Sequence, residues 1–308
     1  MFLLDAEATR AALPWAALLS ELETVCREHV AGLVFCPTRM VVPLGGAGTL
    51  LVMPAVSRGL SITKLVTVHA GNAVLGLPTI QGEVVVIDTR TGQRLMQLDG
   101  PTLTARRTAA VSLLAARLLG AADAQNALLI GTGAQALAHA EALTALMPST
   151  RLHVQGRSAA ASKAFVVQLQ AMGIQAQALT PEQQAWQPWD LIITATTSAT
   201  PVLADASARD ALVVAVGAYR HDMAELPPAL VKRAALFVDD PDGARAEAGD
   251  LLQAGADWGQ VLGLEHLVLD PAAAPQQGMR VFKSVGCARW DLAAARVAAL
   301  HNSNLTEA

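Results

Sequence analysis

A glycine-rich turn between an apolar run and an alanine-rich segment constrains the fold more than any other feature. Residues 127–130 are apolar, and Gly131, Gly133 and Ala136 follow them in a GxGxxA pattern. The first glycine permits a tight bend, the second lets the backbone approach a pyrophosphate, and the small third residue lets a helix pack closely on its strand. The pattern predicts a strand, turn and helix that bind a dinucleotide through Gly131 and Gly133. The alternative is a tight turn that binds nothing.

The sequence around this turn has the pattern of a parallel sheet. Short apolar runs recur between helical stretches, at residues 126–131, 151–155, 174–179, 191–194, 212–217 and 235–238. Such continuous apolar strands are typical of a parallel sheet that helices cover on both faces. Residues 120–285 are therefore expected to form a Rossmann-type domain.

The first third of the chain has a different pattern. After a helix expected at residues 14–32, short β-branched segments are separated by Gly and Pro at residues 38–43, 49–53, 60–69, 83–88 and 94–98. Further helices are expected at 104–119 and 286–301, and the last should return to this front region. The fold class is thus α/β, with a mixed α+β domain at residues 1–119 plus 286–308 beside the Rossmann-type domain.

Composition excludes several classes of protein. The chain has 308 residues, a formal net charge of −4 and 53% hydrophobic residues, which argues against a nucleic-acid binder and against intrinsic disorder. No stretch approaches the about 20 apolar residues that span a bilayer, and the first basic residue comes too late for a secretory signal. We therefore expect no membrane partner. The odd number of cysteines, three without metal-ligand spacing, fits reduced thiols in a cytoplasmic protein better than a disulfide framework. The seven histidines are scattered without ligand spacing, so we expect no metal site.

The end of the second expected strand bears on the choice of dinucleotide. NAD-binding domains usually carry an acidic residue there that holds the ribose 2′-hydroxyl. Here Gln155 ends the strand, and Gly156, Arg157 and Ser158 follow without a carboxylate. A cation and a hydroxyl suit a 2′-phosphate, so NADPH is the expected cofactor and NADH the alternative. Arg157 has a second interpretation, as a solvated charge at the start of a helix.

Lys64 is a cation on an apolar strand face. The period of two along a strand places it with Ile62 and Val66. A buried ammonium is costly unless a negative charge meets it. Either a carboxylate of the protein or a bound anionic substrate is therefore expected beside Lys64.

Two arginines near the start of the third expected helix raise the same question. If Thr104 caps this helix, Arg106 and Arg107 lie in its first turn, where the macrodipole disfavours cations. Arg107 shares the apolar stripe of Val111, so it is the better candidate for a carboxylate clamp, and a structural acid is the alternative. Arg39 shares a strand face with an apolar residue, which is a weaker form of the same argument.

Several segments together resemble the ornithine cyclodeaminase/mu-crystallin family in order and spacing, over nearly the whole chain. The segments that carry the resemblance are residues 103–110, 131–136, 282–286 and 291–295, with Lys64, the turn at 88–92, residues 194–198, Asp239-Asp240 and residues 247–249 in support.

This resemblance implies a homodimer whose front domain binds a small amino or imino acid and completes the dimer. It assigns the substrate carboxylate to Arg39, Lys64 and Arg107. It assigns the cofactor to Gly133, Ala134, Gln135, Arg157, Ser158, Thr196, Val216 and Val285, with Thr108 at the cofactor phosphate.

One departure indicates the branch of the family. Cyclodeaminases have a catalytic Asp two residues after the glycine equivalent to Gly217 and a Lys four residues further on, where this chain has Tyr219 and Met223. The segment therefore resembles the reductase branch. We expect NAD(P)H-dependent reduction of a cyclic ketimine carboxylate, with Lys64, Asp222 or water as the proton donor. The alternatives are an NAD-dependent ornithine cyclodeaminase, an alanine dehydrogenase and a non-catalytic NADPH-binding protein.

Overall fold

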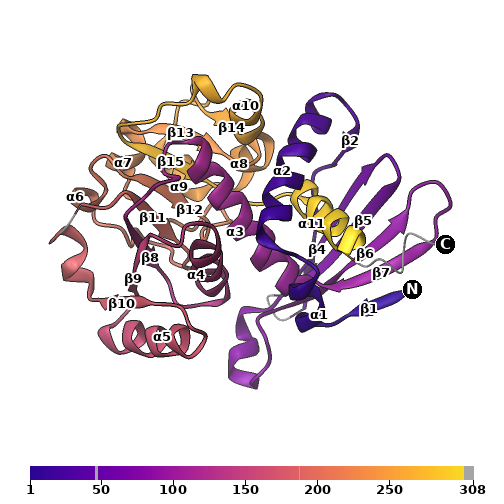
Figure 1. Cartoon of the computed structure of the whole chain (residues 1–308), viewed down its shortest axis with the longest axis horizontal. Coiled ribbons are helices and arrows are strands. Elements are labelled where there is room, and N and C mark those ends of the chain that lie inside the picture. Colours follow the sequence, from indigo (N-terminus) through magenta and orange to yellow (C-terminus); the bar gives the residue numbers. More distant parts are fainter. Residues whose placement is uncertain (46–47, 187, 302–308) are drawn as a thin grey trace. The chain divides into compact units, whose positions relative to one another are not determined.

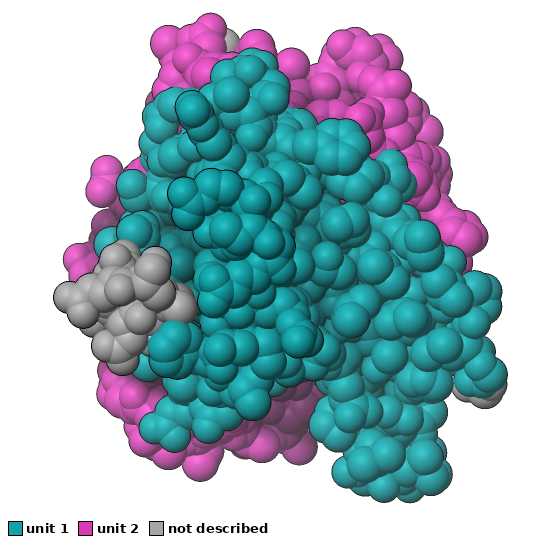
Figure 2. Space-filling view, turned by 90° about the vertical axis from the view of Figure 1, so that its right-hand side faces the viewer, with its two compact units in different colours: residues 1–107, 287–308 teal, residues 108–286 magenta. Residues whose placement is uncertain are grey.

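The computed structural model describes residues 1–45, 48–186 and 188–301. They form two compact units, which Figure 2 distinguishes by colour. Unit 1 comprises Met1–Arg107 and Cys287–Ala308, and unit 2 comprises Thr108–Gly286. The first division falls inside a helix, α3 (Gly100–Leu118), rather than after it.

Unit 2 is built on a parallel eight-stranded sheet, which confirms the expected Rossmann-type architecture. The strand order is β10-β9-β8-β11-β12-β15-β13-β14. The strands are β8 (Asn126–Ile130), β9 (Arg151–Gln155), β10 (Ala176–Leu179), β11 (Leu191–Thr194), β12 (Leu212–Ala215), β13 (Ala235–Val238), β14 (Leu262–Gly263) and β15 (Arg280–Lys283). Strand β8 pairs with β9 on one side and β11 on the other, so the strand order reverses direction there. In open α/β sheets, ligands bind at the carboxyl ends of the strands at such a reversal.

The helices of unit 2 follow the strands in sequence. They are α4 (Ala134–Leu146), α5 (Ala159–Ala171), α6 (Asp205–Ala208), α7 (Pro228–Arg233), α8 (Pro241–Glu247), α9 (Gly249–Ala254) and α10 (Leu264–Leu269), with 3-10 turns at Pro181–Trp186 and Pro271–Ala273. The central strands β11 and β12 are buried along their whole length, because both faces of the sheet are covered. These strands therefore appear in the sequence as continuous apolar runs, without the alternation of apolar and polar residues that a half-exposed strand has.

Strand β15 was missing from the expected strands. It lies in the interior of the sheet, where it pairs with β12 and β13. Its four residues are Arg-Val-Phe-Lys, all of them buried. Charged residues at both ends of so short a run hide its apolar character in the sequence. Lys283 can lie in the interior of the sheet because a carboxylate pairs with its charge.

Unit 1 is a mixed sheet packed on helices. The strand order is β1-β7-β6-β5-β4-β2, and β3 pairs with β4. The strands are β1 (Phe2–Leu4), β2 (Val34–Phe35), β3 (Met40–Leu44), β4 (Gly48–Ser57), β5 (Leu60–Val68), β6 (Ile80–Asp88) and β7 (Arg94–Asp99). The short elements β1, α1 (Ala6–Ala11) and β2 and the 3-10 turn Ala70–Leu75 were not expected.

One face of this sheet is covered by helices that are far apart in the chain. Helices α2 (Trp15–Val30) and α11 (Ala288–His301) lie side by side, and α11 packs on β4, β5 and β6 (Figure 1). The return of the final helix to the front unit is thus observed. Among the described residues, no helix combines the length and the apolar character needed to cross a membrane.

Helix α3 begins earlier than the sequence suggested. The Asp99 carboxylate accepts a hydrogen bond from the Thr102 backbone N–H at 2.8 Å, so Asp99, not Thr104, caps the helix. Arg106 and Arg107 then lie in its second turn. The expectation that they sit against the helix macrodipole was wrong, and any role of Arg107 must rest on its own contacts.

Candidate active site

In unit 1, the ammonium of Lys64 meets a carboxylate of the protein. Lys64 lies on the helix-covered face of β5 with Ile62 and Val66, as the alternation predicted. Its Nζ lies 2.7 Å from Oδ2 of Asp291 on α11, and the side chains of Lys64 and Asp291 are 4% and 0% exposed. The alternative of an internal carboxylate is therefore realised at this position.

The same carboxylate also holds Arg107. The Arg107 Nε donates to Oδ1 of Asp291 at 2.9 Å, and the Arg107 side chain is 6% exposed. Two cations thus share one carboxylate, which leaves this group with one unit of excess positive charge. This contact is made at Nε, so it does not use the edge formed by the two terminal nitrogens of Arg107. A guanidinium edge of this kind matches a carboxylate with two parallel hydrogen bonds.

The electrostatics around Lys64 are finely balanced. Burial lowers the pKa of Lys64 to about 8; the Asp291 charge opposes this shift, and the charges of Arg107 and Arg39 add to it. For Asp291, burial alone would raise the pKa, but the charges of Lys64 and Arg107 hold it below its ordinary value. Arg39, half-buried just before β3, is thereby close enough to act on Lys64. The three cations that the sequence singled out share one electrostatic environment.

Arg106, the neighbour of Arg107, has different contacts. Its Nε and Nη2 donate to the Leu13 carbonyl oxygen at 3.0 and 2.8 Å, and its guanidinium carbon lies 3.8 Å from the ring centroid of Trp15. These contacts fasten α3 to the segment before α2. Arg106 therefore stabilises unit 1, and Arg107 alone of the two belongs to the cation cluster formed by Lys64, Arg107, Arg39 and Asp291.

In unit 2, the glycine turn has the geometry that a dinucleotide requires. Gly131 has φ +132°, and a Cβ there would lie 2.4 Å from the Ala195 carbonyl oxygen. Gly133 begins α4 without a side-chain cap, and no heavy atom lies within 4 Å of the place where its Cβ would be. The first N–H groups of α4, at Ala134 and Gln135, are thus open to an anion. The turn fits the pyrophosphate of a dinucleotide.

The end of β9 presents a second helix N-terminus. Ser158 caps α5, and its Oγ accepts from the Ala161 N–H at 3.2 Å. Arg157 and Ser158 are both exposed. A hydroxyl, a guanidinium and a helix N-terminus therefore occur together at the position that reads the ribose in such domains.

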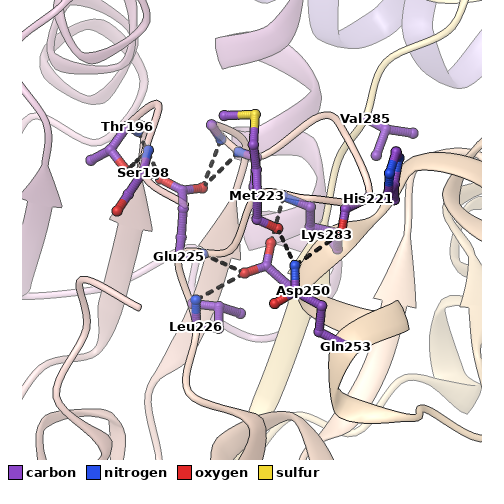
Figure 3. A network of polar contacts seen from close by, with 12 residues as sticks. Thr196, Ser198, His221, Met223, Glu225, Leu226, Asp250, Gln253, Lys283 and Val285 are labelled. Atoms are coloured by element: carbon purple, nitrogen blue, oxygen red, sulfur yellow. Dashed lines mark hydrogen bonds and ion pairs between the residues drawn. The ribbon is translucent and has the colours of Figure 1, made fainter. Parts of the chain in front are cut away.

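A buried carboxylate organises the loops after β11 and β12. Glu225 is 0% exposed, and its Oε1 accepts from the backbone N–H and the hydroxyl of Thr196 at 2.7 and 2.8 Å. Its Oε2 accepts from the N–H of Gly217 at 2.8 Å and of Ala218 at 3.2 Å. Thr196 and the residue after Val216 are thus held by the same side chain (Figure 3).

Two further buried carboxylates extend this arrangement. Asp250 Oδ1 accepts from the backbone N–H groups of Glu225 and Leu226, and its Oδ2 lies 2.9 Å from Lys283 Nζ, with both side chains of the pair 0% exposed (Figure 3). Asp239 accepts from the Ser284 hydroxyl and from the N–H groups of Val285 and Gly286.

Sequence reasoning did not assign roles to Glu225, Asp250, Asp239 or Lys283. The available signal was their position in or beside otherwise apolar segments, but a buried carboxylate cannot be recognised until its N–H donors are placed. Thr108, expected at the cofactor phosphate, is buried in α3, where its carbonyl accepts from the Ser112 hydroxyl at 3.0 Å.

Asp222 lies outside the buried networks. Its carboxylate is bound by Arg220 at 2.8 and 2.9 Å, and the two side chains are 53% and 58% exposed. The hydrogen bonds from Arg220 hold the pKa of Asp222 below its ordinary value. Asp222 is therefore charged at neutral pH, which is unfavourable for a proton donor.

The chain is similar to known proteins over nearly its whole length. The chain matches the model of the ornithine cyclodeaminase/mu-crystallin family over residues 2–303. It is 46% identical over 296 residues to Delta(1)-pyrroline-2-carboxylate reductase 2 of Burkholderia ambifaria, with 96% of this chain and 94% of that protein covered. The same identity and coverage are found with the Delta(1)-pyrroline-2-carboxylate/Delta(1)-piperideine-2-carboxylate reductase of Azospirillum brasilense. The structure of Thermococcus litoralis Delta(1)-pyrroline-2-carboxylate reductase in complex with NADH and L-proline has a TM-score of 0.90 at 25% identity, covering 99% of this chain and 98% of that one.

The Asp250–Lys283 pair generates a stability prediction. Asp250→Asn leaves the Lys283 charge buried without its partner, and we expect the free energy of unfolding to fall by about 3–5 kcal/mol. Lys283→Met added to Asp250→Asn should restore part of this loss, because no unpaired buried cation remains. Urea unfolding of the single and double variants measures both effects. Asp222→Asn, in an exposed pair, is the control and should leave the midpoint unchanged; a double variant as unstable as the sum of the singles would contradict the prediction.

Proposed function

Because the chain belongs to the ornithine cyclodeaminase/mu-crystallin family, we propose that it is an NAD(P)H-dependent reductase of cyclic ketimine carboxylates. The substrates are Δ1-pyrroline-2-carboxylate and Δ1-piperideine-2-carboxylate, and the products are proline and pipecolate. The relatives at 46% identity support this reaction, since their names specify it. The absence of the cyclodeaminase Asp and Lys, replaced by Tyr219 and Met223, argues against ornithine as substrate.

The observation that carries the proposal is the excess positive charge of the cation cluster. Lys64 and Arg107 share the single charge of Asp291, so a substrate carboxylate completes the neutralisation. Arg107 offers its terminal nitrogens to the two carboxylate oxygens, and Arg39 adds charge at the edge of the cluster. Each charge-assisted hydrogen bond contributes about 1.5–3 kcal/mol.

Lys64 is the proton donor that we propose. Its pKa of about 8 leaves it mostly protonated at neutral pH, yet it gives up a proton far more easily than an ordinary lysine. Protonation of the ring nitrogen makes the C=N carbon electrophilic. A buried acid with a pKa near the working pH is well suited to this step, whereas Asp222 is exposed and charged.

The bound dinucleotide supplies the hydride that reduces the C=N carbon. Gly131, Gly133 and the first N–H groups of α4, at Ala134 and Gln135, hold its pyrophosphate. Glu225 holds Thr196 and Gly217, the residue after Val216, and Asp239 holds Val285. These loops would contact the rest of the cofactor. Positioning and orientation of the reactants are the main contributions of a protein to hydride transfer.

The reaction is tested by following oxidation of reduced cofactor with freshly prepared ketimine carboxylates. We expect turnover with both ring sizes and no ammonia from L-ornithine. Arg107→Lys cannot form two parallel hydrogen bonds with the substrate carboxylate. This variant should raise the KM for the ketimine about tenfold to a hundredfold, with the affinity for NADPH unchanged. Ammonia release from ornithine, oxidation of the cofactor by pyruvate and ammonia, or cofactor binding without any turnover would each overturn the proposal in favour of another function.

NADPH is the cofactor that we propose for this chain. The exposed Arg157 and the Ser158 cap at the start of α5 support it, since no carboxylate stands there to repel a 2′-phosphate. Arg157→Gln should raise the KM for NADPH about tenfold and leave that for NADH within twofold. Lys163→Gln, which removes an exposed charge further along α5, is the matched control. A wild-type preference for NADH would contradict the assignment.

A homodimer is supported by the open face of the unit 1 sheet. On the face away from α2 and α11, the apolar side chains Val52, Val56, Leu65, Val85 and Ile87 stay partly exposed. Light scattering should give twice the chain mass of 32.0 kDa, and Val56→Glu should yield monomers, because a charge in an apolar interface is unpaired. A wild-type monomer would refute the dimer. The odd number of cysteines, three in the sequence, fits reduced thiols better than a disulfide framework, which supports a cytoplasmic location.

A further inference from the structure

Asp291 receives two cations at once, and the two contacts use different oxygen atoms. Oδ2 meets Lys64 Nζ at 2.7 Å, and Oδ1 accepts from Arg107 Nε at 2.9 Å. The Asp291 side chain is 0% exposed. Water therefore cannot replace either contact, and the carboxylate is the fixed point from which both cations are oriented.

The contact at Nε determines how the Arg107 guanidinium is turned. A carboxylate can meet a guanidinium along the Nε edge or along the edge formed by the two terminal nitrogens. Asp291 occupies Nε and so prevents rotation about the Cδ–Nε bond. A second carboxylate must then bind the terminal nitrogens, and it meets them already oriented.

The contact between Asp291 and Lys64 favours the protonated form of the Lys64 side chain. The groups that act on Lys64 are Asp291 from α11, Arg107 and the Thr104 hydroxyl from α3, the latter at 3.5 Å, and Arg39 from the segment before β3. Asp291 is the acid in this set. Burial and the two arginines all favour the neutral amine, so the charge of Lys64 depends on one carboxylate.

We infer that Asp291 is a positioning residue of the reductase, which keeps Lys64 protonated and turns Arg107 toward the substrate carboxylate. This inference rests on the proposed function and adds a residue that does not itself touch the substrate. It assigns two separable effects to one side chain. The charge of Asp291 sets the proton affinity of Lys64, and its position sets the orientation of Arg107.

The pH profile of the reductase tests the first effect. Lys64 acts in its protonated form, so kcat/KM should fall as the pH rises through about 8. In Asp291→Asn the neutral amine is favoured further, and this alkaline limb should move to lower pH by one unit or more. The KM for the ketimine should also rise about tenfold, because Arg107 is no longer turned toward its ligand.

Asp291→Glu separates charge from position. It retains the negative charge, so the alkaline limb should stay within half a pH unit of the wild type. Its longer side chain displaces both contacts, so the KM should still rise. Because it keeps a negative charge beside Lys64 and Arg107, this variant also serves if Asp291→Asn does not fold. A glutamate variant with unchanged KM, or with its limb shifted by one unit, would overturn the inference.

Arg296→Gln provides the matched control on the same helix. Arg296 forms ion pairs with Glu21 and Glu28 at 3.0 and 2.6 Å, and its side chain is 14% exposed. Its loss should weaken the packing of α11 on α2 without moving the alkaline limb. A limb that shifts equally in Arg296→Gln and Asp291→Asn would show a structural effect only. Failure of the proposed function is a different outcome: in that case the wild-type protein does not reduce the ketimines at all.

Discussion

A carboxylate without access to solvent, Asp291, neutralises cations from two other elements of unit 1. It lies on α11, while Lys64 lies on β5 and Arg107 on α3. Burial of any one of these charges alone would be costly, and the attraction between Asp291 and the two cations offsets part of that cost. The sum of their charges is not zero, and this remainder distinguishes the cluster from an ordinary structural ion pair. A fully neutral cluster would have no electrostatic reason to attract an anion.

In unit 2, buried carboxylates bind backbone N–H groups. Glu225, Asp250 and Asp239 each collect N–H groups from loops at the carboxyl edge of the parallel sheet. Loops that would otherwise have many conformations are thereby fixed. Asp250 also pairs with a buried cation, Lys283, and this pairing lets a strand with a charged end occupy the interior of the sheet.

The sequence predicted local features well and long-range partners poorly. The glycine turn, the positions of the apolar strands and the orientation of Lys64 follow from spacing over a few residues, and they are present as expected. The start of α3 was placed too late, because Asp99 caps it from the end of the preceding strand. The partner of Arg107 could not be foreseen, since Asp291 is 184 residues away in the chain, and no periodicity relates residues at that distance. Strand β15 was missed for a different reason: Arg280 and Lys283 at its two ends hide the apolar character of a four-residue run.

The position of α11 in the chain has a consequence for biosynthesis. Unit 2 is continuous, so the ribosome delivers all of it before Cys287 emerges. The first 107 residues leave the ribosome with Lys64 and Arg107 but without the acid that neutralises them. The face of the unit 1 sheet that packs against α11 stays uncovered by that helix until α11 is translated. Unit 2 can therefore fold before α11, the helix that unit 1 still lacks, has been synthesised.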